Sequence, residues 1–172
     1  IATAFFARLT PQQGDALATA YRALPSTAAD ARAFAARIWE EKERPEPGRT
    51  LGRLTTEQVA AARASRPEAD TAGFDFSISP DEVKHAFKEH GIQSIEARRG
   101  QRAITPEDFA LLPRILNTGM PRFVGLSRER QHPLFEIRAV IDGAEYVTVW
   151  ERWTKRRTLS LLTFFVRKGK KS

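Results

Sequence analysis

The fold of this chain is decided by three stretches near the end of the sequence: LFEIRAVID (134–142), EYVTVWERW (145–153) and TLSLLTFFVRK (158–168). Each is rich in β-branched, aromatic and aliphatic residues, which favour strands. Asp142-Gly143 is typical of a tight hairpin turn, and the basic connector TKRR (154–157) joins the second stretch to the third. The sequence therefore predicts a three-stranded antiparallel meander.

Upstream of the meander the pattern is mainly helical. Ser79-Pro80-Asp81-Glu82 combines a serine N-cap, a proline at the first helical position and acids in the first turn, and Gly91 ends that segment. Pro113 predicts a kink or break in a later helix. Helices are expected at 3–24, 28–44, 55–64, 80–89 and 105–116, and short strands at 74–78 and 123–126. The predicted fold class is α+β, with helices packed on the C-terminal meander.

Two regions differ in composition. Residues 1–70 are rich in alanine and carry no cluster of chemically reactive side chains, and residues 65–73 have the small and acidic residues of a linker. We predict a helical adapter at 1–70 and a functional domain at 71–172. The net charge is +7 and the sequence pI is about 10.2, and all of the excess positive charge follows residue 75. This distribution favours a polyanionic partner for the second region.

Composition also excludes several kinds of functional site. The chain has no cysteine, which excludes disulfides and thiolate ligands. No apolar run approaches the roughly 20 residues that span a bilayer, and we expect neither a membrane span nor a signal peptide. His85 and His90 are five residues apart, unlike the i, i+4 spacing of two zinc ligands on a helix, and His132 precedes a proline without supporting context. We predict no metal and no cofactor.

The remaining candidates are imidazole, guanidinium and hydroxyl groups, which suit RNA cleavage by the ribose 2′-hydroxyl without a metal. Strand alternation predicts that Arg157 and Thr163 share one face of the last strand. His90 borders the apolar face of its helix and could instead be a core histidine, and Thr163 could be only a strand former. Trp150 and Trp153 could stack bases, although a core position is the alternative for one of them.

Several of these segments together resemble a known superfamily. VKHAFKEHG (83–91), RGQ (99–101), ITPEDF (104–109), LPRIL (112–116) and the meander with RRTLSLLTFF (156–165) are similar, in order and spacing, to phage-type nucleases of the barnase–EndoU–colicin–RelE superfamily. The resemblance covers residues 74–168. It departs at Trp150, where the family more often has an acidic residue, and at residues 120–133, which do not align with the family. The resemblance implies a barnase/RelE-like scaffold and a metal-independent endoribonuclease that leaves a 2′,3′-cyclic phosphate.

The resemblance also implies roles for individual residues. The catalytic candidates are His85, His90, Arg157 and Thr163, and the choice between the two histidines stays open. The resemblance implies Arg99 as a substrate-binding residue, and the polar side chains of the meander add Arg152, Lys155, Arg156 and Ser160 as further candidates. The implied partners are RNA, with tRNA as one candidate, and an acidic immunity or antitoxin protein. Such domains are bacterial or phage-encoded and act in a target-cell cytoplasm after secretion, or in the cytoplasm of the producing cell.

Two other functions remain open. One is a non-catalytic nucleic-acid-binding or phage head-associated structural module. The other is an ADP-ribosyltransferase, for which Glu151 is available although the Arg…Ser-Thr-Ser…Glu order is missing. RNA product analysis separates the first from the ribonuclease, and labelled NAD separates the second. The ribonuclease hypothesis also makes a geometric prediction: His85 or His90 should lie within a phosphate's reach of Thr163.

Overall fold

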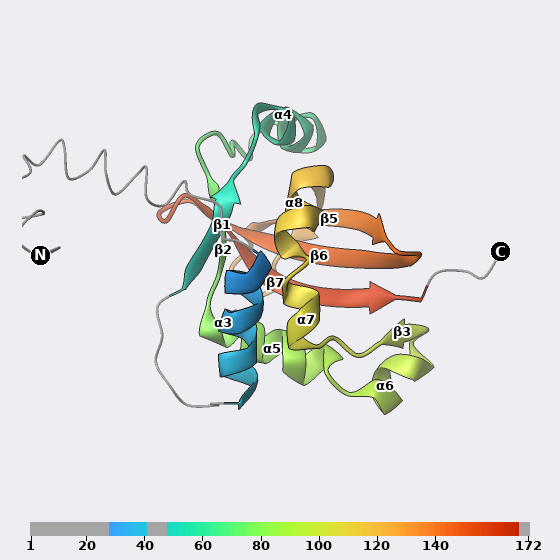
Figure 1. Ribbon diagram of the computed structural model, residues 1–172. Coiled ribbons are helices and arrows are strands. Elements are labelled where there is room, and N and C mark those ends of the chain that lie inside the picture. The colour runs from blue at the N-terminus through green and yellow to red at the C-terminus, as the bar shows by residue number, and fades with distance from the viewer. Residues whose placement is uncertain (1–27, 41–47, 169–172) are drawn as a thin grey trace, which may run out of the picture.

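The computed structural model describes residues 28–40 and 48–168, and its fold is α+β, as predicted (Figure 1). Its strands are β1 (Arg49–Arg53), β2 (Asp75–Ile78), β3 (Gln101–Arg102), β4 (Arg122–Leu126), β5 (Pro133–Ile141), β6 (Ala144–Trp153) and β7 (Thr158–Arg167). They form one sheet in the order β1-β2-β7-β6-β5-β4, and β3 also pairs with β7. β2 pairs with β7 in parallel, and the other neighbours are antiparallel.

The predicted meander is confirmed as β5, β6 and β7. Asp142 and Gly143, with φ angles of 51° and 77°, form the turn between β5 and β6. The predicted alternation of β7 was wrong, however, because Val149 pairs with Thr163 whereas Trp150 pairs with Leu161. This bulge adds one residue to β7 and reverses the faces beyond it. Leu159 and Leu161 are therefore buried together with Phe164 and Val166, and Thr163 points the other way.

The helices are α3 (Ala28–Glu40), α4 (Thr56–Ser65), α5 (Pro80–His90), α6 (Gln93–Arg98), α7 (Pro106–Phe109) and α8 (Leu112–Thr118). α4 and α5 begin with capping boxes, Thr55 with Gln58 and Ser79 with Glu82. The break predicted near Pro113 separates α7 from α8. α6, β1 and β3 were not predicted. The helix expected at 3–24 and the end of the one expected at 28–44 lie outside the described residues.

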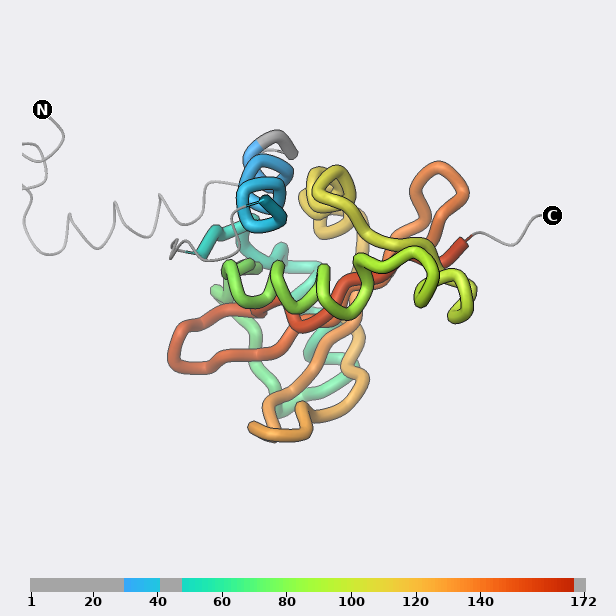
Figure 2. The backbone as a smooth tube through the Cα atoms, turned by 90° about the horizontal axis from the view of Figure 1, so that it is seen from below, coloured from blue at the N-terminus to red at the C-terminus, as the bar shows by residue number. Residues whose placement is uncertain are grey.

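A single apolar core joins the helices to one face of the sheet. Phe76 meets Trp150 edge to face, and Phe109 makes ring contacts with Phe87 and Phe164. Figures 1 and 2 show α3, α7 and α8 on the same side of the sheet. Phe34 of α3 is fully buried in the same cluster, so residues on both sides of the expected boundary at 70 share one core. Among the described helices, none has the length and apolar composition needed to cross a bilayer.

α5 lies beside the middle of β7, where that strand pairs with neither β2 nor β3. β2 pairs with the start of β7, up to Ser160, and β3 pairs with its end, from Val166. α5 connects these two regions and packs against β7 between them. The strand face opposite the apolar core carries Ser77, Glu151, Ser160 and Thr163. We call this the open face of the sheet, to distinguish it from the core face, although Glu151 and Ser160 are each only 4% exposed there. α5 lies along its edge.

Candidate functional site

His90, at the end of α5, is held between two partners. Its Nδ1 lies 3.0 Å from Oε2 of Glu96, and its Nε2 lies 3.0 Å from Oγ1 of Thr163. The Glu96 side chain is fully buried, and its other oxygen accepts a 3.0 Å hydrogen bond from Arg99. The imidazole also stacks at a tilt on Phe165, with the ring centroids 5.4 Å apart. The buried carboxylate thus fixes the orientation of the His90 ring, and Nε2 is directed to β7.

His132 forms a second arrangement of the same kind. Its Nδ1 lies 3.4 Å from Oε1 of Glu151, a side chain that is only 5% exposed, and the other oxygen of Glu151 lies 3.5 Å from Arg130. Within the described part of the chain, neither His132 Nδ1 nor Glu151 Oε1 has a hydrogen-bond partner, although both atoms are buried. Because an unpaired buried polar atom is costly, such a pair is a candidate for a functional role.

The loop between β4 and β5 brings His132 to this position. Ser127 N–H donates to the His132 carbonyl at 2.8 Å, and His132 N–H donates to the Ser127 hydroxyl at 3.1 Å. The imidazole then meets Trp153 edge to face. Sequence reasoning missed this site because His132 and Glu151 are far apart in the sequence and lie close together only through the pairing of β5 with β6. The pairing of Leu134 with Glu151 is the signal that could have found it.

Both arrangements lie on the open face. Glu151 is opposite Ser160, and Val149, two residues earlier on β6, is opposite Thr163. Alternate residues of a strand share a face and are about 7 Å apart, so the two histidines contact neighbouring positions of this face. The Ser160 hydroxyl lies 3.0 Å from that of Ser77 on β2. One imidazole, hydrogen-bonded to a buried glutamate, and a second, 3.4 Å from another buried glutamate, therefore lie near a row of hydroxyl groups.

Trp153 and Glu82 are two further residues near the histidines. The guanidinium groups of Arg130 and Arg156 each lie 4.9 Å from the Trp153 ring centroid. Burial raises the pKa of Glu82 to about 7, an effect opposed by its hydrogen bonds at Ser79 and by the charge of Arg156 and reinforced by Glu151. Glu82 lies at the beginning of α5 and His90 at its end, so this helix contributes a titratable group near each end of the open face.

The structure separates the residues that were predicted to act together. His90, Arg99 and Thr163 form one cluster, which confirms the expected contact between a histidine and Thr163. His85 is exposed on the outer side of α5. Arg157 lies in the turn before β7, and its Nη2 donates to the Ala72 carbonyl rather than approaching Thr163. The catalytic role of each residue stays a prediction.

The other substrate-binding candidates lie around the β6–β7 turn and on the strands beside it. Lys155 and Arg156 are exposed in the turn, whereas Ser160, on the open face, is only 4% exposed. Arg152 points to the opposite face, where it donates two hydrogen bonds to the Asp70 carbonyl and stacks on Phe74. Its contacts hold the loop before β2. Trp150 is fully buried, so of the two tryptophans on β6 only Trp153 is placed to stack a base.

Comparison with protein-family models, with curated proteins and with solved structures finds no match for this chain. Across residues 28–40 and 48–168, no cluster of three or more histidine, aspartate or glutamate side chains is arranged to hold a metal ion.

Proposed function

We propose that this chain is a metal-independent endoribonuclease and that its active site is on the open face. One observation carries the proposal: His90 and His132 each place Nδ1 beside a buried glutamate, and both lie on the same face of β6 and β7. A carboxylate that binds one ring nitrogen sets the tautomer and orientation of an imidazole, and the second nitrogen is then available for proton transfer. Cleavage of RNA by its own 2′-hydroxyl needs two such groups, a base and an acid.

In the proposed reaction, Nε2 of one histidine removes the proton from the 2′-hydroxyl, which attacks the adjacent phosphorus. Nε2 of the other histidine protonates the departing 5′-oxygen. The products are a 2′,3′-cyclic phosphate and a free 5′-hydroxyl. Which histidine is the base stays open. His90 Nε2 must exchange its contact with Thr163 for the substrate, whereas the His132 side chain is 33% exposed, against 13% for His90.

The neighbouring side chains would bind and stabilise the substrate. Thr163 and Ser160 can donate hydrogen bonds to phosphate oxygens. Arg99 and Arg130, whose side chains are about half exposed, can stabilise the charge of the transition state while they hold Glu96 and Glu151. Trp153, the part-exposed aromatic residue of this group, can stack a base that displaces Arg130 or Arg156 from its ring.

The proposal extends to the biological setting implied by the resemblance. We propose membership of the barnase–EndoU–colicin–RelE superfamily, RNA as substrate with tRNA as one candidate, and an acidic immunity protein as the neutralising partner. The net charge of +7 favours an acidic partner because opposite charges accelerate association. We also propose a bacterial or phage origin and action in the cytoplasm, either of a target cell or of the producing cell.

The test is product analysis on total RNA and on tRNA in buffer with EDTA. We expect fragments with 2′,3′-cyclic phosphate ends, and we expect His90→Gln and His132→Gln each to lower kcat/KM by about 10²- to 10⁴-fold. His85→Gln distinguishes the assignments, because a lower rate in that variant would return the catalytic role to His85. Lys88→Gln, an exposed change on the same helix, is the control.

Two outcomes would contradict the proposal. Full rate in both His90→Gln and His132→Gln would exclude the two-histidine mechanism. Salt-dependent RNA binding without any product would instead favour the non-catalytic nucleic-acid-binding module.

A further inference from the structure

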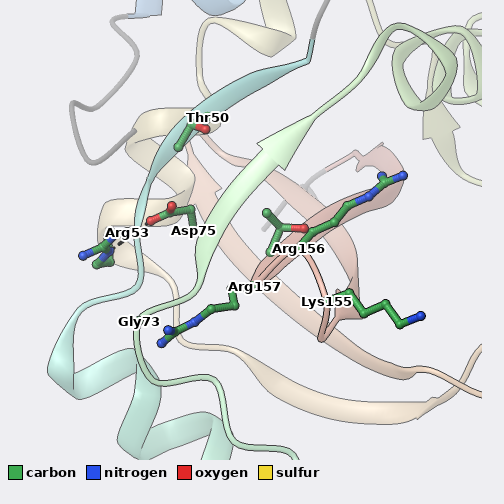
Figure 3. A pocket seen from close by; sticks show the side chains of 8 residues that line it. Thr50, Arg53, Gly73, Asp75, Lys155, Arg156 and Arg157 are labelled. Atoms are coloured by element: carbon green, nitrogen blue, oxygen red, sulfur yellow. Dashed lines mark hydrogen bonds and ion pairs between the residues drawn. The ribbon is translucent and has the colours of Figure 1, made fainter. Parts of the chain in front are cut away.

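A basic pocket lies on the open face at the other end of the sheet from His90. Its volume is about 570 Å³, and its charged lining consists of Arg53, Asp75, Lys155, Arg156 and Arg157. It is formed between the β1–β2 pair and the turn that connects β6 to β7 (Figure 3). Four cations and one carboxylate give this lining a net positive charge. A pocket of this size holds a small ligand, and its charge favours an anion.

Two of the guanidinium groups are fixed by the protein. Nε of Arg53 lies 3.1 Å from Oδ1 of Asp75, whose side chain is 10% exposed. Nη2 of Arg157 donates to the Ala72 carbonyl at 3.0 Å. A Cβ atom at Gly73 would approach Nη2 of Arg157 to 2.5 Å, so a side chain there would displace the end of Arg157. Each group retains further N–H donors for a ligand, because a guanidinium has five.

Strand pairing connects this pocket to the proposed catalytic residues. Trp153 is opposite Thr158, Thr158 is opposite Asp75, and Asp75 is opposite Arg53, so these four residues form one row across the open face. The next row along the strands contains Glu151, Ser160 and Ser77. The pocket is therefore one row away from Glu151.

The β6–β7 turn supplies cations on both sides of this row. Figure 3 shows Arg157 extending towards Gly73, whereas Lys155 and Arg156 extend from the turn in the opposite direction. Arg156 stacks on the Trp153 ring, which Arg130 also contacts, and Arg130 pairs with Glu151. A continuous series of cationic and aromatic groups thus leads from Glu151 to the pocket.

We infer that this pocket binds a nucleotide phosphate, at a position separate from the phosphate that is cleaved. The inference rests on the proposed ribonuclease function for its RNA substrate, and it assigns Arg157 to this second phosphate instead of the reacting one. An RNA chain would lie across the open face, with one phosphate at the two histidines, a base at Trp153 and a further phosphate between Arg53 and Arg157. Fixed guanidinium groups suit this role because they bind phosphate in a defined geometry.

The test is a binding measurement that does not depend on cleavage. We expect the wild-type chain to bind a 2′-O-methyl RNA tetranucleotide about tenfold more tightly than the dinucleotide, because only the longer chain reaches the pocket. Arg157→Gln and Lys155→Gln should reduce this difference, and each should lower the slope of log K against log salt by about 1. Lys88→Gln removes a charge from an exposed position outside the pocket and should leave the difference unchanged.

Further measurements identify the source of the phosphate and distinguish a failure of the pocket from a failure of the ribonuclease function. If AMP competes with the tetranucleotide, and Arg157→Gln abolishes this competition, the pocket accepts a free mononucleotide. If AMP does not compete, the pocket is restricted to a nucleotide of the RNA chain. Arg157→Gln is checked for a native thermal unfolding transition, and Lys155→Gln tests the pocket without changing the contact to Ala72. Equal tetranucleotide affinity in wild type and both variants would overturn the inference, even if RNA is cleaved. Weaker binding in the variants without any RNA cleavage would retain the pocket and reject the ribonuclease.

Discussion

At the residue scale, Glu82 connects the proposed site to stability. Its carboxyl has a pKa of about 7 in the folded chain, against an ordinary value of 4.5. The folded state therefore keeps this proton at a pH at which the unfolded chain has lost it. The resulting stabilisation is present below pH 4.5 and is lost as the pH rises to 7.

Glu82→Gln should remove this pH dependence while retaining the capping hydrogen bond to Ser79, because glutamine can fill the same position. We expect the free energy of unfolding of the wild type to fall by roughly 1–3 kcal/mol more than that of the variant between pH 5 and pH 8. Urea titrations at the two pH values measure the difference. Glu89→Gln, at an exposed position of the same helix, is the control. An equal change in the free energy of unfolding between the two pH values, in wild type and in Glu82→Gln, would contradict the raised pKa of Glu82.

The candidate site could be predicted only in part from single residues. His90 was identified because it lies on a helix whose boundaries follow from local capping signals, and Thr163 because it lies on a clear strand. His132 was set aside because its neighbours in the sequence give no indication of Glu151, which approaches it through strand pairing. Arg157 was assigned to Thr163 by strict strand alternation, which the bulge at Val149 and Trp150 interrupts.

At the element scale, Arg102 joins three elements. Its Nη1 donates to Oδ2 of Asp108 at 2.8 Å, and its Nη2 donates to the Tyr146 hydroxyl at 3.0 Å, which links β3 to α7 and β6. The Asp108 hydrogen bond is the main cause of a raised pKa of Arg102. These bonds keep β3 beside the end of β7, close to the turn that follows His90.

Arg102→Lys should weaken this junction although it keeps the charge, because a lysine ammonium cannot reproduce the two-pronged contact with Asp108 and also reach Tyr146. We expect a loss of about 2 kcal/mol in the free energy of unfolding, measured by urea denaturation. Arg114→Lys, at an exposed position of α8, should change it by less than about 0.5 kcal/mol. An equal, small effect of both changes would show that the junction adds nothing to stability.

The elements that could be predicted are those whose signals are local. The capping boxes of α4 and α5, the Asp142-Gly143 turn and the break near Pro113 all depend on neighbouring residues. β1 and β3 are short and lack clear alternation, and they exist because other strands offer them hydrogen-bond partners. α6 has no side-chain N-cap, so its beginning carried no recognisable signal.

At the scale of the whole molecule, the shared core predicts that residues 71–172 do not fold stably alone. Removal of residues 1–70 would delete β1 and the buried side chains of Phe34, Ile38 and Leu51. Each fully buried side chain of this size contributes about 1.5–3 kcal/mol, and the total is comparable with the stability of an ordinary domain. Near-UV circular dichroism and urea titration of the 71–172 fragment provide the measurement. A fragment with the urea midpoint of the full chain would establish residues 1–70 as a separable adapter.

The position of β7 has a consequence for the order in which the molecule folds. β7 is the last strand of the described chain, yet it lies between β2 and β6 and pairs with residues about 80 positions earlier. The β1–β2 pair is therefore not joined to β6, β5 and β4 until β7, which ends at residue 167, has been synthesised. Contacts of such long sequence separation slow folding. We expect the chain to stay unfolded on the ribosome until that point, so the two histidines meet on the open face only after the whole sheet has formed.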